Sequence, residues 1–93
     1  MTNTIKAVTK DPNAVLDYGV RWTPWLGTGE TISASSWVVP AGLTADSDDH
    51  DDTTARVWLR GGTAGASYVI TNHIVTTAGR EDDRSLLIVV DET

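Results

Sequence analysis

The densest group of side chains that could do chemistry is the acidic run at residues 46–52. It places five carboxylates and His50 within seven residues. Calcium takes about six to eight oxygen ligands, which calcium-binding loops supply from alternating Asp residues and a final bidentate Glu, with a Gly at the sharp turn. The run lacks that spacing, that Gly and that Glu, so we expect neither a metal nor a cofactor. We favour the interpretation that the run is a solvated loop whose charge keeps the chain soluble, and calcium binding stays an open alternative.

Catalytic chemistry finds little support among the other polar residues. His50 and His73 lie far apart in the sequence, and His73 falls in a stretch that we expect to be a strand. No Ser lies in the Gly-x-Ser-x-Gly pattern of a nucleophile elbow, and so small a domain offers scarcely any cleft for paired carboxylates. We therefore expect no zinc site, no catalytic residues and no enzyme activity.

Tryptophan supplies most of the aromatic side chains, since the chain has four Trp, two Tyr and no Phe. Trp22 and Trp25 flank a Pro, and we expect one to face the core and the other to cap its edge, although such a pair can also stack on sugars. Trp58 falls on the same side of its strand as Arg56 and Arg60. Because Trp and Arg are enriched in protein interfaces, these three residues are predicted partner contacts.

Composition narrows the classes of protein. A length of 93 residues allows one domain with one core. The absence of Cys excludes disulfides, so packing or assembly with a partner must hold the fold. A formal charge of −6 with only seven scattered Lys and Arg argues against nucleic-acid binding. No stretch resembles a signal peptide or reaches the ~18 apolar residues of a membrane span, so we expect a soluble protein made in a cytoplasm.

Alternation of apolar and polar residues predicts an all-β chain without a long helix. Residues 16–22 alternate clearly, and a phase slip near Ser35 and Ser36 predicts a bulge in the following strand. The apolar run at residues 85–90 has the length of a strand and is apolar on both faces, so it should lie inside a sheet or meet a partner. The expected strands cover residues 4–8, 16–22, 31–39, 43–45, 55–60, 68–75 and 85–90.

The glycines of residues 61–65 predict a turn, because Gly readily takes a positive φ. Tyr68 follows Gly65 at the start of the next strand, where immunoglobulin-type sandwiches place a Tyr whose hydroxyl bonds back across the corner. Gly65 and Tyr68 are therefore predicted to form a structural corner. The chain is predicted to be a small Ig-like antiparallel β-sandwich of about six to eight strands, with this strand as the penultimate one.

A Pro-centred turn at residues 10–13 divides the chain into two parts. We expect an extended N-terminal arm over residues 1–13 and the β-sandwich domain over residues 14–93. A domain this small has few surfaces that could hold such an arm, so a neighbouring subunit is expected to order it. Ile5 and Val8 are therefore predicted partner contacts, with simple fraying as the alternative.

Four segments of the sequence carry a family resemblance: KDPNAVLDY at residues 10–18, WTPWL at 22–26 with TI at 31–32, VWLRGGTAGASY at 57–68 and TAGREDDRSL at 77–86. Together they resemble the fiber-tail adaptor proteins of tailed bacteriophages, over about residues 10–90. The acidic run is richer in Asp than the family leads us to expect, which leaves room for a role peculiar to this chain.

The resemblance implies a structural Ig-like protein of the virion, assembled in the host cytoplasm, that links the tail to its fibers. It implies several copies in a symmetric assembly, with phage proteins of the tail or portal-proximal ring and the fibers as partners, and with neither nucleic acid nor membrane. The family brings no catalytic residues. The alternatives are a capsid decoration protein and a calcium- or sugar-binding module. Copy number in the particle distinguishes an adaptor from a decoration protein.

Overall fold

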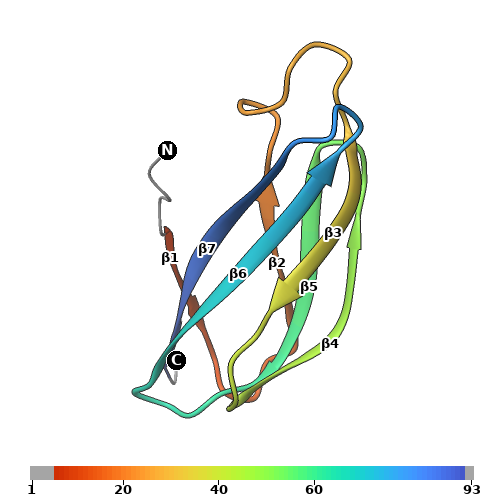
Figure 1. Cartoon of the computed structure of the whole chain (residues 1–93). Helices are drawn as coiled ribbons and strands as arrows, with labels where there is room; N and C mark the ends of the chain where they lie inside the picture. Colours follow the sequence, from red (N-terminus) through yellow and green to blue (C-terminus); the bar gives the residue numbers. More distant parts are fainter. Residues whose placement is uncertain (1–5, 92–93) are drawn as a thin grey trace.

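Seven β-strands build the protein in this computed structural model, which describes residues 6–91 (Figure 1). No helix occurs among those residues, and so none that could cross a membrane. The predicted all-β class is confirmed. In chain order the strands are β1 (Lys6–Lys10), β2 (Leu16–Arg21), β3 (Ile32–Val38), β4 (Leu43–His50), β5 (Thr54–Gly61), β6 (Ser67–Thr76) and β7 (Glu81–Val90).

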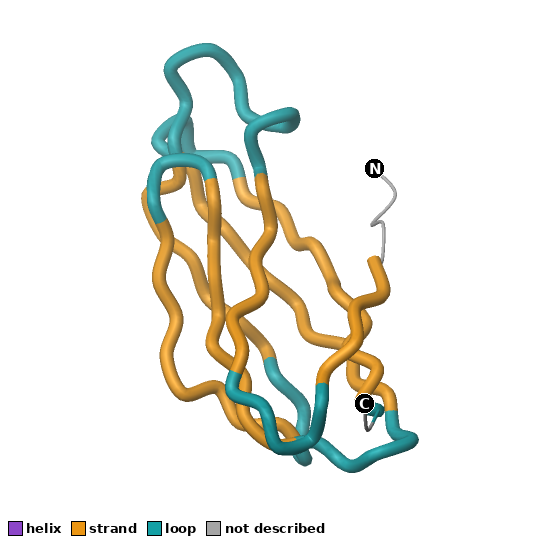
Figure 2. The backbone as a smooth tube through the Cα atoms, turned by 180° about the vertical axis from the view of Figure 1, so that it is seen from behind, coloured by secondary structure: helices purple, strands orange, loops and turns teal. Residues whose placement is uncertain are grey.

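The strands form two layers. One sheet has the order β1-β7-β6-β3 and the other has the order β2-β5-β4. Neighbouring strands are antiparallel except β1, which is parallel to β7. The two sheets pack face to face, and the connections between strands gather at the two ends of the sandwich (Figure 1; Figure 2). This is the architecture of an Ig-like sandwich, with β6 as the penultimate strand, as predicted.

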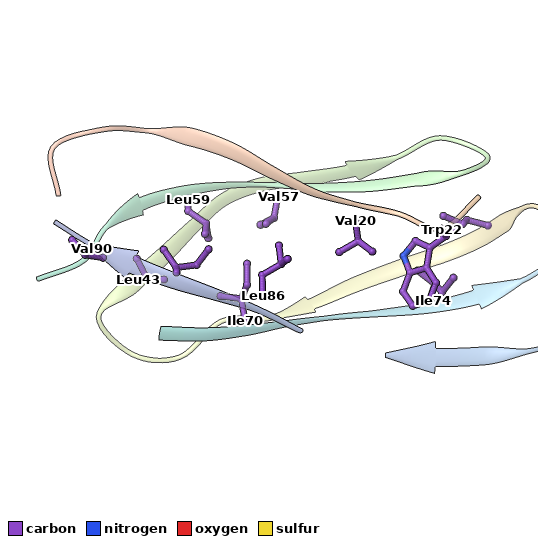
Figure 3. Packing of buried hydrophobic residues seen from close by; sticks show 11 residues of the cluster. Val20, Trp22, Leu43, Val57, Leu59, Ile70, Ile74, Leu86 and Val90 are labelled. Carbon is purple, nitrogen blue, oxygen red and sulfur yellow. The ribbon is translucent and has the colours of Figure 1, made fainter. Parts of the chain in front are cut away.

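The core lies between the sheets, where alternate residues of each strand point inward. From β5, Ala55, Val57 and Leu59 are completely buried. Ile70 of β6 and Leu86 of β7 approach Val57 and Leu59 from the opposite sheet (Figure 3). Burying an aliphatic side chain of this size stabilises a fold by about 1.5–3 kcal/mol relative to leaving it exposed. The chain has no disulfide, so this packing is the main source of its stability.

The N-terminal segment differs from the prediction. Residues 6–10 are not part of an extended arm, because they form β1 and pair with β7, which places Val8 opposite Ile88. Val8 packs against the core, so its contact lies inside the sandwich and not on a free arm. The sandwich thus includes residues that the predicted boundary at residue 14 assigned to the arm. Ile5 lies outside the described residues.

Lys10 fastens the end of β1. Its side chain is almost fully buried, and Nζ donates hydrogen bonds to the carbonyl oxygens of Gly61 at 2.7 Å and Asp11 at 2.9 Å. Burial lowers the pKa of Lys10, with the nearby Asp11 charge acting in the opposite direction. The contact with Gly61 joins β1 of one sheet to the end of β5 in the other.

The acidic run is mostly strand, which corrects the prediction of a loop after a short strand at residues 43–45. β4 continues to His50, and the connection to β5 begins only at Asp51. β4 is an edge strand, and all of its residues after Leu43 are exposed. Asp is disfavoured in strands, but pairing with β5 overrides that preference here. Carboxylates on an open edge discourage pairing with a further strand.

The last strand occupies the interior position that its apolar residues predicted. β7 lies between β1 and β6, although it begins earlier than expected, at Glu81. The predicted bulge in β3 is also present, but the register shifts between Ile32 and Ala34 and not at Ser35 and Ser36.

The corner before β6 is built around a tyrosine. Gly65 has a φ of 86°, a left-handed conformation that Gly adopts without a steric penalty. The backbone N–H of Thr63 donates a hydrogen bond of 3.1 Å to the Tyr68 hydroxyl oxygen. The Tyr68 ring lies against Gly42, where a Cβ would come within 2.8 Å of Cε1. Tyr68 therefore joins the turn before β4 to the turn before β6.

Candidate protein-interaction surface

The outer side of β5 carries the three predicted contact residues together. Because the inward positions of this strand are the buried Ala55, Val57 and Leu59, the alternate residues Arg56, Trp58 and Arg60 face outward. Trp58 lies between the two arginines with 40% of its surface exposed, which is unusual for so large an apolar side chain.

Both arginines are held by carboxylates of the acidic strand. The Arg60 guanidinium donates from Nε to both oxygens of Asp46 at 3.1 Å and from Nη2 to Oδ2 at 2.9 Å. The Arg56 Nε donates to Asp49 Oδ1 at 2.9 Å. The hydrogen bonds from Arg60 lower the pKa of the Asp46 carboxyl, so the pair stays charged at neutral pH. The acidic run thus positions the arginines beside Trp58.

The neighbouring strands leave the indole accessible. Trp58 lies opposite Asp17 of β2 and Ser47 of β4, both small polar residues. Gly19 lies opposite Arg56, and a Cβ there would approach Cγ of Arg56 to 3.2 Å, so glycine gives the arginine room. We call this outer side of β2, β5 and β4 the Trp58 face. Its members are Asp17, Asp46, Asp49, Arg56, Trp58 and Arg60.

The aromatic pair at the other end of β2 belongs to the core and its cover. Trp22 is completely buried and meets Trp25 edge-on, with ring centroids 5.3 Å apart. Arg84 lies over the Trp22 ring at 4.4 Å and Arg80 over the Trp25 ring at 4.0 Å. Since Trp22 is buried and both rings carry guanidinium groups, this pair offers no open platform for a sugar, and Trp58 is the accessible indole among the three.

A carboxylate completes the cover over Trp25. Glu30 accepts hydrogen bonds from Nε of Arg80 at 2.9 Å and from the Thr76 hydroxyl at 2.5 Å. The bonds from Arg80, and after them the one from Thr76, lower the pKa of Glu30 to about 2. Arg80 also donates to the Trp25 carbonyl oxygen at 3.1 Å. This group fastens the long β2–β3 connection to the hairpin before β7.

The two histidines lie on different sheets, since His50 ends β4 and His73 belongs to β6. His73 faces outward from β6, where Asp83 contacts its Nδ1 and Glu81 contacts its Nε2 at 2.9 Å. The hydrogen bond with Asp83, and then that with Glu81, raises the pKa of His73. His50 lies at the end of β4, where its Nδ1 meets the Asp51 carbonyl oxygen at 3.0 Å.

The acidic run shows no convergence of carboxylates on one point. Over residues 6–91, no three His, Asp or Glu side chains lie together as a metal ion would require. In the run itself, Asp46 and Asp49 bind arginines, while Asp51 accepts the backbone N–H groups of Thr53 and Thr54 at 2.9 and 2.8 Å. The predicted calcium alternative therefore gains no support from this arrangement.

Comparison with known proteins decides the family. A sequence-family profile described as podophage GP4 fiber-tail adaptor protein gp77 matches residues 10–89, which is most of the chain. The chain belongs to this family. Among curated proteins, no sequence matches it.

A solved structure independently supports the fold of this fiber-tail adaptor family member. The solution structure of the PKD domain from KIAA 1837 protein is similar with a TM-score of 0.53 and 18% identity, over 94% of this chain and 79% of that chain. At that identity the similarity concerns the fold alone. It agrees with the two-layered Ig-like sandwich described above.

For this family member, the sequence placed Trp58 and its two arginines on one outward face but missed the carboxylates that hold the arginines. The sequence did contain a signal for these carboxylates, because a chain reversal between residues 50 and 54 pairs the acidic run with β5 in register. The prediction that the run is a loop concealed this pairing. The predicted contacts Val8 and Ile5 are not part of the Trp58 face: Val8 packs inward, and Ile5 lies outside the described residues.

Proposed function

We propose that this chain is a structural adaptor of the phage particle that joins the tail to its fibers through protein–protein contacts. Its family supports the role, and the Trp58 face supplies a surface suited to one of the contacts. The main observation that supports this contact is the exposed Trp58, which lies between two arginines that Asp46 and Asp49 already hold in place. We propose no catalytic, nucleic-acid or membrane role.

The physical suitability of this face comes from preorganisation. Trp and Arg are the residue types that most often dominate binding energy when they are truncated to Ala. Long side chains normally lose rotamer freedom on binding, and this cost opposes association. Because Arg56 and Arg60 are held by carboxylates before any partner arrives, much of that cost is already met in folding. The exposed ion pairs themselves contribute little to stability.

The proposed setting is the virion, with the chain made and assembled in the host cytoplasm. Several copies around a symmetric tail would act together, since repetition converts modest single contacts into high overall avidity. The same assembly would stabilise a small sandwich that lacks disulfides, because partners that bind the folded state shift the folding equilibrium toward it.

The test is to replace Trp58 by Ala in the phage and to measure the fibers on purified particles by quantitative mass spectrometry. We expect particles with about tenfold or more fewer fibers, or without the chain itself, since truncating a central interface Trp costs about 2 kcal/mol or more. The purified variant should keep its urea midpoint, because Trp58 lies outside the core.

Thr28→Ala is the control, because Thr28 is exposed in the β2–β3 connection and so lies outside the Trp58 face. Its particles should carry the normal number of fibers. A normal fiber content in Trp58→Ala particles would contradict the proposed contact. A chain present in shell-like numbers on the head would favour the capsid decoration alternative over the adaptor.

A further inference from the structure

The outer side of the four-stranded sheet is a second surface with the composition of an interface. An outward sheet face that meets water normally alternates toward polar residues. Here Val38 of β3 is 67% exposed and Val69 of β6 is 47% exposed, and Leu87 and Val89 of β7 are half-buried at outward positions. Val69 lies directly opposite Leu87, and Val38 lies opposite Thr71, two residues along β6 from Val69, so the aliphatic side chains form one patch that crosses strands.

One end of this patch is acidic. Asp83 and Glu81 occupy outward positions of β7 further toward its start, with His73 between them on β6. At about 3.4 Å per residue in an antiparallel strand, Asp83 lies about 14 Å from Leu87. The face therefore presents an aliphatic centre and, at a defined distance along the strands, two carboxylates that share one imidazole.

A second copy of this chain does not complement such a surface. Among the described side chains on this face none is Lys or Arg, since Arg84 turns inward over Trp22 and Arg80 covers Trp25. If two copies met by this face with parallel strands, carboxylates would oppose carboxylates. With antiparallel strands, the Asp83 end would oppose the uncharged end at Ser67 and Val89. In either arrangement the second copy brings no Lys or Arg to the acidic end.

We infer that the outer face of β1, β7, β6 and β3 binds a different protein, which presents an aliphatic surface flanked by Lys or Arg. The aliphatic part of that partner covers Val38, Val69 and Leu87, and its cation meets the carboxylates beside His73. This inference rests on the proposed adaptor role and extends it. The face belongs to the sheet opposite the Trp58 face, so one copy can hold two partners at the same time, as a joining protein must.

The test is site-specific photo-cross-linking in intact particles, with a benzoyl-phenylalanine placed at Val69. We expect a cross-link to one other virion protein, at a peptide whose surface carries aliphatic side chains and Lys or Arg. The same probe at Thr28, which is exposed in the β2–β3 connection and lies outside both faces, serves as the control and should give little product. Replacing Glu81 by Gln together with Asp83 by Asn should lower the Val69 cross-link yield several-fold, because the partner's cation loses its carboxylates.

A second variant measures the aliphatic part directly. Val69→Lys should reduce incorporation of the partner about tenfold or more, while Thr28→Lys should not. Both purified variants should keep the wild-type urea midpoint, since both side chains are exposed.

Three results would overturn the inference. They are a Val69 cross-link only to another copy of this chain, a yield at Val69 no higher than at Thr28, or a partner peptide that is acidic. If the chain is in the particle and Trp58→Ala depletes fibers, but the probe at Val69 gives no cross-link to another virion protein, the inference fails and the adaptor role stands. If the chain is absent from the particle, both fail.

Discussion

The two sheets share a buried hydrogen-bond group that can be tested quantitatively. Trp22 donates from Nε1 to Asn72 Oδ1 at 2.9 Å, and both residues are completely buried. Asn72 Nδ2 donates in turn to Ser35 Oγ at 2.9 Å and to the Ser36 carbonyl oxygen at 3.0 Å. The amide of Asn72 therefore has a partner for each of its donors and connects the end of β2 to β6 and β3.

Asn72→Leu keeps a similar side-chain volume but removes every one of these bonds. It leaves the fully buried Trp22 Nε1 donor without its partner, and such an orphaned buried group costs about 1–3 kcal/mol. We therefore expect Asn72→Leu to lower the free energy of unfolding by about 1–3 kcal/mol. That is a substantial share of the about 5–15 kcal/mol available to a domain.

A double-mutant cycle isolates the Trp22–Asn72 bond from the packing. Trp22→Phe leaves Asn72 Oδ1 unpaired and also removes part of a large buried ring. The double variant Trp22→Phe with Asn72→Leu has neither orphaned end of this bond. Its destabilisation should fall short of the sum of the single values by about 1–3 kcal/mol.

Urea unfolding followed by far-ultraviolet circular dichroism measures all four proteins. Equal slopes of free energy against urea would show that the comparison is sound. Destabilisations that add within about 0.5 kcal/mol would refute the reasoning, because they would mean that Trp22 and Asn72 do not interact.

Three further outcomes follow from single residues. Gly62→Ala should destabilise the fold by more than Gly65→Ala in urea unfolding. Both positions have a positive φ, at which a side chain costs about 1–2 kcal/mol, but of the two only Gly62 would place the new Cβ against another residue, Val90 at 2.7 Å. Equal losses of stability in the two variants would contradict this. Glu30 has its pKa lowered from 4.5 to about 2, so its stabilisation is complete above pH 4.5 and is lost as the pH falls toward 2; Glu30→Gln should flatten this part of the stability-against-pH curve, and an unchanged slope would count against the contact. His73 has its pKa raised, so its stabilisation is complete below about pH 6.5 and fades as the pH rises through the higher folded value; His73→Gln should remove that decline, and its persistence would show another group to be responsible.

Much of the fold could be predicted from the sequence, because apolar and polar residues alternate along several strands, as they do when one side of a strand is buried and the other meets water. Residues 16–22 and 55–60 gave strands β2 and β5 nearly to the residue, and the Tyr68 corner identified the penultimate strand. Trp58 could be predicted as an outward residue for the same reason, since its neighbours on either side are apolar and buried.

The missed features depend on contacts between segments distant in sequence. A strand over residues 4–8 was expected, but its place in the sandwich could not be predicted, because its residues have no strong pattern of their own and are held by the edge of β7. The strand character of Asp46 to His50 arises from pairing with β5, against the local preference of Asp. The pairing of Arg60 with Asp46 follows from that register, so an error in one strand concealed part of the candidate surface.

The central claim is that this chain sits between the tail and its fibers and joins them. A cryo-electron microscopy map of the purified virion tests it most directly, because a sandwich of 41 × 25 × 20 Å can be fitted into density and its faces assigned. The account predicts a ring of such sandwiches at the junction, with the Trp58 face against one of the two partners. Density for the chain on the head shell, or no density for it anywhere in the particle, would contradict the account.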